Sequence, residues 1–141
     1  MIGRLSIFAV FLGLVASTLV GAIVGVVGGV ILALYRPSDF EWLTAPGSTS
    51  PNLSVTAMIL IASLAGAIAA GYASARHAVG DELVNASATG LVLLLLTVAG
   101  YEEPWFHQIP LWCTLAIGGL SLPLSLLGGY LQRGNDSAEP R

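Results

Sequence analysis

The chain has 141 residues, of which 55% are hydrophobic and only 9% are charged, and its mean hydropathy is +0.84. Because soluble domains carry a charge on about a quarter of their residues, this composition excludes a soluble globular protein and indicates an integral membrane protein. The net charge is -3, there is no lysine, and the five basic residues are spread singly, so the chain has no basic patch with which to bind nucleic acid.

The first hydrophobic run, residues 5–34, contains no charge and carries a small residue at every fourth position. In lipid, such a stripe lets a second helix backbone approach closely, and close packing is what drives helix association there. At about 1.5 Å per residue the run would be about 45 Å long, more than the roughly 30 Å hydrocarbon core, so we expect this helix to tilt or protrude. The small residues are Ala9, Gly13, Ser17, Gly21, Gly25, Gly29 and Ala33.

A polar outer connection, residues 37–54, leads to a second predicted helix at residues 55–75, which repeats the small-residue stripe. We therefore expect the first two helices to pack closely against each other. Because a step of four residues advances about 400° around a helix, each stripe drifts by about 40° per step, and the first helix should meet different neighbours at its two ends. The small residues of the second stripe are Ala62, Gly66, Ala70 and Ser74.

A short polar segment, residues 76–82, predicts a tight cytoplasmic hairpin that leads into a third helix at residues 83–99. Asp81 can cap the start of this helix. Asn85 and Thr89 lie one turn apart on one of its faces. We predict that they form hydrogen bonds between helices, and the alternative is that they line a pore.

The second outer connection, residues 100–109, holds the densest group of reactive side chains in the sequence: Glu102, Glu103 and His107. Two carboxylates and an imidazole could supply three metal ligands. No second His or Cys stands at a ligand spacing, so we interpret the group as part of a solvated interfacial loop and predict no metal site.

The fourth helix is predicted at residues 110–131 and begins at a proline, which suits the first helical position. Pro123 lies inside it and cannot donate to the carbonyl four residues earlier, so we expect a kink that could act as a hinge. Ser121 and Ser125 are further candidates for interhelical hydrogen bonds or, in the alternative, for a pore lining. We expect the polar segment from Gln132 onward to be frayed.

The distribution of arginines predicts the orientation of the chain in the membrane. Basic residues are enriched in cytoplasmic segments, so both termini are expected in the cytoplasm, with Arg36 alone on the outer side. The four arginines on the predicted inner side are Arg4, Arg76, Arg133 and Arg141.

Several features within residues 60–133 form a pattern that resembles a widespread group of small four-helix bacterial membrane proteins of unknown function. They are the small-residue string at 66–76, the leucine-rich third helix, Pro-Trp-Phe at 104–106 and Gly-Gly-Tyr at 128–130. The resemblance implies a multi-pass location in the bacterial inner membrane and the same topology, and it supplies no catalytic residues.

Together these features predict an all-α, four-transmembrane-helix bundle that forms a single domain over residues 1–141. The predicted spans contain no charged residue, although transporters and membrane enzymes usually hold one at depth, so we expect no enzyme activity, no catalytic residue and no cofactor. Our first hypothesis is a structural or accessory protein, in contact with membrane lipid, that is a subunit of a larger complex or a homo-oligomer. The alternative is an oligomeric channel or small-solute permease lined by Asn85, Thr89, Ser121 and Ser125.

Overall fold

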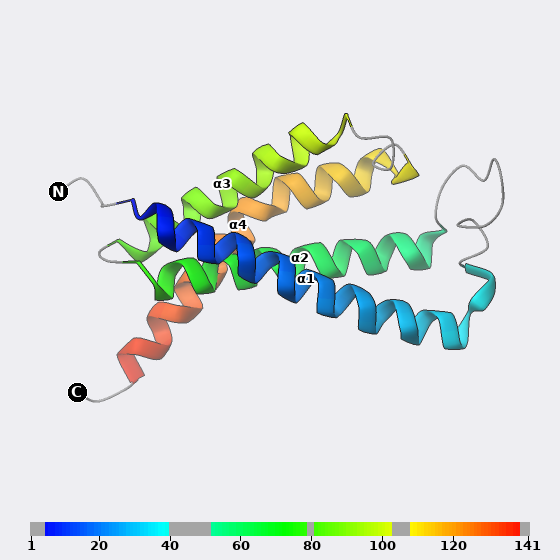
Figure 1. The fold of residues 1–141 in the computed structure, drawn as a ribbon, viewed down its shortest axis with the longest axis horizontal. Coiled ribbons are helices and arrows are strands. Elements are labelled where there is room, and N and C mark those ends of the chain that lie inside the picture. The colour runs from blue at the N-terminus through cyan, green and yellow to red at the C-terminus, as the bar shows by residue number, and fades with distance from the viewer. Residues whose placement is uncertain (1–4, 40–51, 79–80, 103–107, 139–141) are drawn as a thin grey trace.

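The computed structural model describes residues 5–39, 52–78, 81–102 and 108–138. Over these residues the chain is all-helical, with four helices that run alternately up and down (Figure 1). Each helix is long and apolar enough to cross a membrane, which confirms the predicted four-helix transmembrane bundle. The helices are α1 (Ile7–Tyr35), α2 (Leu53–Arg76), α3 (Glu82–Gly100) and α4 (Leu111–Ala138).

Side-chain caps fix the starts of the first two helices. The Ser6 hydroxyl oxygen accepts a hydrogen bond from the backbone N–H of Ala9 at the start of α1, and the Asn52 side chain accepts one from Val55 at the start of α2. Asp81 precedes α3 as predicted, but its side chain makes no capping hydrogen bond.

α4 is longer than the sequence analysis predicted. The helix continues to Ala138, whereas we expected it to end near residue 131 and to be frayed from Gln132 onward. Gln132 is buried, with 5% of its surface exposed, so tertiary packing holds the turn at which the polar sequence begins. A glycine such as Gly134 disfavours a helix by only about 1 kcal/mol, which is too little to end it.

α2 is the central helix, since its contacts with the other three helices are the most extensive in the bundle. Its small residues lie on more than one face, and this lets neighbouring backbones approach from different sides. The α1-facing side carries Gly66, where a Cβ would lie 2.9 Å from the carbonyl oxygen of Ser17. Only glycine fits at this distance from a backbone atom.

α1 and α2 pack closely near the start of α1, as their two small-residue stripes predict. A Cβ on Gly13 would lie 2.7 Å from the carbonyl oxygen of Ala70, 3.0 Å from Cβ of Ser74 and 2.9 Å from Cγ2 of Thr89. Because Thr89 belongs to α3, this end of α1 meets two helices. Three helices, α1, α2 and α3, therefore meet closely near Gly13.

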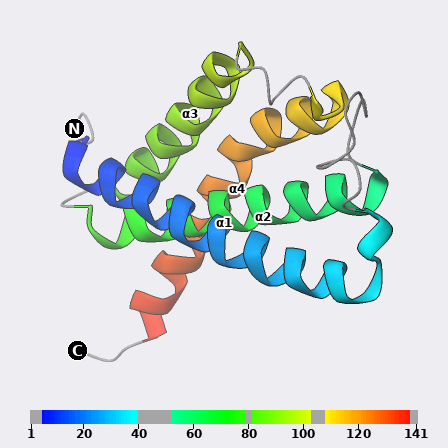
Figure 2. The same ribbon diagram turned by 45° about the vertical axis from the view of Figure 1, so that its right-hand side comes forward.

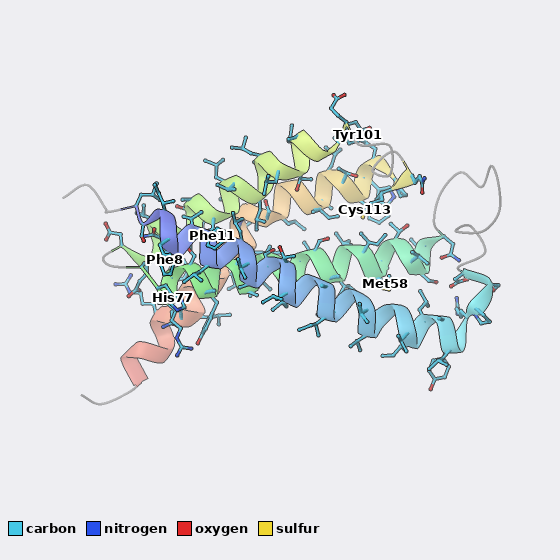
Figure 3. All side chains as sticks on the ribbon, in the orientation of Figure 1. Phe8, Phe11, Met58, His77, Tyr101 and Cys113 are labelled. Carbon is cyan, nitrogen blue, oxygen red and sulfur yellow. The ribbon has the colours of Figure 1, made fainter. Side chains whose placement is uncertain are left out.

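Farther along, the contact between α1 and α2 becomes looser. A Cβ on Gly21 would lie 3.5 Å from the carbonyl oxygen of Ala62, and one on Gly25 would lie 3.8 Å from Cβ of the same residue. Gly29 faces the sulfur of Met58, with a corresponding distance of 3.7 Å (Figure 3). These are ordinary van der Waals distances, so the second half of the α1 stripe is not pressed against a backbone.

The closest backbone approach among the described glycines is between α2 and α4, a contact that the sequence analysis did not predict. A Cβ on Gly71 would overlap the carbonyl oxygen of Ser125, and a Cβ on Gly128 would overlap the carbonyl oxygen of Ile68. These two glycines lie on facing helices, so each backbone fits against the other where no side chain intervenes.

α4 changes direction around Pro123, which confirms the predicted kink (Figure 2). Proline removes a backbone donor from the helix interior, and its ring clashes with the carbonyl four residues earlier. In both views the helices lie close together around the start of α1 and spread apart towards the end of α1 and the start of α4 (Figures 1 and 2). We call these regions the closed end and the open end of the bundle.

Candidate functional site

A group of buried polar side chains joins the helices at the closed end. Asn85 of α3 is fully buried, and its Oδ1 accepts a hydrogen bond of 2.7 Å from the backbone N–H of Ser6. Its Nδ2 donates a hydrogen bond of 2.9 Å to the carbonyl oxygen of Asp81. Asn85 therefore fixes the residue that caps α1 against the start of α3.

Thr89 lies one turn further along α3 and forms the next interhelical contact. Its hydroxyl oxygen lies 2.9 Å from the hydroxyl oxygen of Ser74 in α2 and 2.8 Å from the carbonyl oxygen of Asn85. Both hydroxyl residues are fully buried. The contact with Ser74 holds α3 against α2 in a bilayer, where no water competes, whereas the contact with Asn85 lies within α3.

Two serines of α4 make the corresponding contacts with α3. Ser125 donates a hydrogen bond of 2.7 Å to the carbonyl oxygen of Ala86, and Ser121 lies 2.7 Å from the carbonyl oxygen of Gly118 and 3.3 Å from that of Gly90. The two serines are 0% and 3% exposed. The four polar residues proposed for helix contacts or a pore are thus all inside one copy of the chain, with their side chains in hydrogen bonds.

A cavity of about 320 Å³, which we call the central cavity, lies between the four helices. α2 supplies a floor of small residues that includes Ala62, Ser63 and Ala67, while α1 supplies Thr18 and Ala22 at the exposed side. The opposite walls come from α3, through Thr97, and from α4, through Ile117. The sequence stripe predicted that Ala62 would serve helix packing, but not that the helices would leave a space beside it.

Five hydroxyl side chains line the central cavity, and four of them, all but that of Ser17, lie within hydrogen-bonding distance of a backbone carbonyl of their own helix. Thr18 donates to the carbonyl oxygen of Leu14 over 3.1 Å, Ser63 to that of Ile59 over 2.9 Å, and Thr97 to that of Leu93 over 2.9 Å. Ser121, which also lines the cavity, lies within hydrogen-bonding distance of Gly118 as described above. The cavity therefore presents mainly carbon atoms, although several of its residues are polar.

A second space, which we call the α3–α4 groove, lies at the open end and has a volume of about 530 Å³. Its sides are mostly apolar, and Tyr101 and Glu102 stand at its end near the close of α3. Gly118 and Gly119 form part of its α4 wall. A Cβ on Gly119 would meet no atom within 4 Å, so this position is open to the surroundings.

Only one of the three side chains considered as metal ligands, that of Glu102, lies within the described residues. Glu102 is exposed at the end of α3, whereas Glu103 and His107 lie outside the described residues. Within the part of the chain that the structure describes, no three His, Cys, Asp or Glu side chains are grouped closely enough to hold a metal ion.

Cys113, the single cysteine, belongs to the interior packing of α4 against α2 (Figure 3). Its side chain is 0% exposed, and its sulfur lies 3.9 Å from the carbonyl oxygen of Thr56. This placement agrees with the behaviour of a free cysteine as a small hydrophobic residue.

Comparison of the chain with protein-family models, with characterised proteins and with solved structures found no match. The resemblance to small bacterial four-helix membrane proteins remains a prediction on which these comparisons do not bear.

Proposed function

We propose that this integral membrane protein is a structural or accessory component that associates sideways with another transmembrane chain, either a further copy or a different subunit. The observation that supports this proposal is the exposed face of α4 around Gly119. A Cβ there would meet no atom within 4 Å, and the neighbouring Leu111 and Leu115 are 57% and 65% exposed. This face is shaped to admit another helix closely.

Pro123 gives a physical reason why a partner helix on the Gly119 face would be stabilising. Because proline has no N–H, the carbonyl of Gly119 loses its α-helical donor. Both residues lie near the middle of Leu111–Gly134, the membrane-crossing part of α4. A backbone carbonyl without a donor in hydrocarbon costs several kcal/mol. A second helix packed on Gly119 would bring Cα–H groups or a side-chain donor to that carbonyl and displace lipid from it.

The α3–α4 groove lies beside this face and extends the surface available to a partner. Leu94 and Val98 of α3 border the groove, opposite Leu115 and Gly118 of α4. Side chains from a neighbouring helix can enter the groove while its backbone rests on Gly119. The two features together favour a helix-packing role for this side of the molecule.

The channel hypothesis receives less support from the geometry. The residues proposed to line a pore are buried within one copy and donate to or accept from other groups of the same chain, as described for Asn85, Thr89, Ser121 and Ser125. A polar solute passing between copies would therefore not reach them. We also propose that the protein has no catalytic activity, because its predicted membrane spans contain no charged residue.

We also propose that the protein resides in the bacterial inner membrane with both termini in the cytoplasm. Arg76 ends α2, and Arg133 lies in the last part of α4, so both belong to the ends of their helices nearest the start of α1 (Figure 1). Arg36, the C-cap of α1, lies at the opposite end. This arrangement follows the tendency of arginines to gather on the cytoplasmic side.

The association can be tested by single-molecule photobleaching of the full chain in vesicles and in its native membrane. We expect Gly119→Leu to weaken association by roughly tenfold, which corresponds to about 1.4 kcal/mol. Gly134→Leu is the matched control, because a Cβ on Gly134 also meets no atom within 4 Å but lies at the far end of α4. Both variants should fold as the unmodified chain does.

Two results would contradict the proposal. One is that the Gly119→Leu and Gly134→Leu variants associate equally, which would show that association does not use the Gly119 face. The other is an unmodified chain that is monomeric in vesicles and is also recovered from its native membrane without any stoichiometric partner.

A further inference from the structure

We propose that the central cavity is a binding site for the hydrocarbon chain of a membrane lipid. This inference goes beyond the proposed association, because the central cavity and the Gly119 face are different surfaces. With a volume of about 320 Å³, the cavity falls within the range of roughly 300–1,000 Å³ that is usual for small-molecule sites. Its lining residues come from all four helices and lie within or beside the apolar spans.

The lining offers few groups that could bind a polar solute, which favours hydrocarbon. The hydroxyl hydrogens of Thr18, Ser63 and Thr97 are already used in bonds to carbonyl oxygens of the same helices. Binding a sugar, an ion or a cluster of water molecules requires free donors and acceptors, because a polar group transferred into a site without partners loses its hydration. Methyl and methylene groups need no such partners.

The cavity opens towards lipid between α1 and α3. Thr18 and Ala22, on the α1 side, are exposed, and Leu93 and Thr97, on the α3 side, are half-buried. α1 and α3 are joined tightly only at the closed end, where Gly13 contacts Thr89. A chain from the surrounding lipid can therefore enter sideways without passing through the interior of the bundle.

The small residues of α2 give this site its depth. Ala62 and Ala67 are 8% and 3% exposed, so the surrounding bilayer reaches this floor only through the cavity. An empty space in a bilayer lacks partner atoms for dispersion contacts on its walls. A flexible acyl chain restores those contacts, and it is the most abundant apolar material next to the opening.

The proposal can be tested with the full chain in vesicles of phosphatidylcholine that include a phosphatidylcholine carrying a diazirine on its acyl chain. After illumination, the adducts are mapped by peptide mass spectrometry. We expect adducts on the cavity floor at Ala62, Ser63 or Ala67, in addition to adducts on outward-facing residues such as Leu95 and Val98, which report the ordinary lipid surroundings.

A blocking substitution and a matched control make the result specific. Ala22→Phe places a ring at the exposed side of the cavity, whereas Ile23→Phe places the same ring at the next position, which is 61% exposed and does not line the cavity. We expect floor adducts to be lost in Ala22→Phe and retained in Ile23→Phe. Adducts on Leu95 and Val98 should be unchanged in both variants, which would also show that the fold persists.

The proposal is overturned if the floor stays unlabelled while the outward-facing residues are labelled, or if Ala22→Phe leaves the floor labelling unchanged. It is also overturned if a water-soluble diazirine labels the floor in place of the lipid probe, because the cavity would then hold water. Gly119→Leu should leave floor labelling intact, so failure of the assembly proposal and failure of the lipid site give different results.

Discussion

Individual glycines in this bundle differ in what surrounds them, and that difference sets the cost of replacing each one. At Gly71 a Cβ would overlap the carbonyl oxygen of Ser125, which belongs to a backbone and cannot rotate away. At Gly21 the nearest atom would be the carbonyl oxygen of Ala62, at the ordinary distance of 3.5 Å. The same added methyl group is therefore a clash in one place and a tolerable contact in the other.

We expect Gly71→Ala to lower the free energy of unfolding by about 1–3 kcal/mol or more, because α2 and α4 must separate to admit the methyl group. Gly21→Ala should be neutral or stabilising by up to about 1 kcal/mol, since alanine favours helix more than glycine does. Thermal unfolding of the two variants in the same detergent measures both effects. Equal melting temperatures would show that the α2–α4 contact does not limit stability.

The buried amide of Asn85 shows how one residue can organise a distant segment. Its Oδ1 binds the backbone N–H of Ser6, which is 79 positions away in the chain. Without this bond, the buried N–H of Ser6 would have lost its hydration without gaining a partner, which is destabilising, and the bond to Asn85 avoids this penalty. The residue thus ties the start of α1 to α3, whereas the glycines in the second half of α1 face α2.

At the scale of elements, α4 makes a close backbone contact with α2 and is interrupted by a proline. Its second half carries Gly128, where a Cβ would overlap the Ile68 carbonyl oxygen, and its middle carries Pro123. The second half lies against both α2, through Gly128, and α3, through Ser125, and the two halves of the helix run in different directions (Figure 2).

Pro123→Ala restores an N–H that can donate to Gly119, so we expect α4 to straighten in part. Spin labels at Leu115 and Leu131, which are 65% and 52% exposed and lie on either side of the kink, should move farther apart. The distance is measured by pulsed electron paramagnetic resonance in a Cys113→Ala background, so that only the introduced cysteines carry labels.

A label pair on α3, at Val84 and Leu95, which are 40% and 57% exposed, serves as the control and should keep its distance. If both pairs are unaffected by Pro123→Ala, tertiary packing rather than the proline holds the bend. If the control pair also changes, the substitution has altered the bundle more widely than the restored hydrogen bond explains.

At the scale of the whole molecule, the bundle has a closed end joined by polar contacts and an open end where the helices spread (Figure 1). The closed end contains the Asn85 contacts and the close approach at Gly13. The α3–α4 groove lies at the open end, and the central cavity lies between the helices. If both termini are cytoplasmic, as we propose, the open end faces the outer side of the membrane.

This orientation predicts which ends of the helices are reachable from outside the cell. In a Cys113→Ala background, a cysteine at Ser38, just after α1, should react with a membrane-impermeant maleimide applied to intact cells. A cysteine at His77, the C-cap of α2, should react only after the membrane is opened. Both positions are exposed in the folded chain. The reverse pattern of labelling would place both termini outside.

The sequence by itself determined the number of helices and most of their limits, because hydropathy belongs to each residue whatever its neighbours in space. It also predicted the approach of α1 to α2, because a stripe of small residues along a membrane helix allows a second helix to pack closely against it. The kink at Pro123 was equally predictable, since a missing N–H is a local property.

Only the tertiary structure decided that α2 is central, that Gly71 meets Ser125, that Asn85 reaches Ser6 and that a cavity remains beside Ala62. In a bilayer both the lipid-facing and the protein-facing sides of a helix are apolar, so composition does not reveal which side is buried. The contacts and the cavity depend on how each helix is rotated and tilted against its neighbours. Those angles result from the packing of all four helices at once.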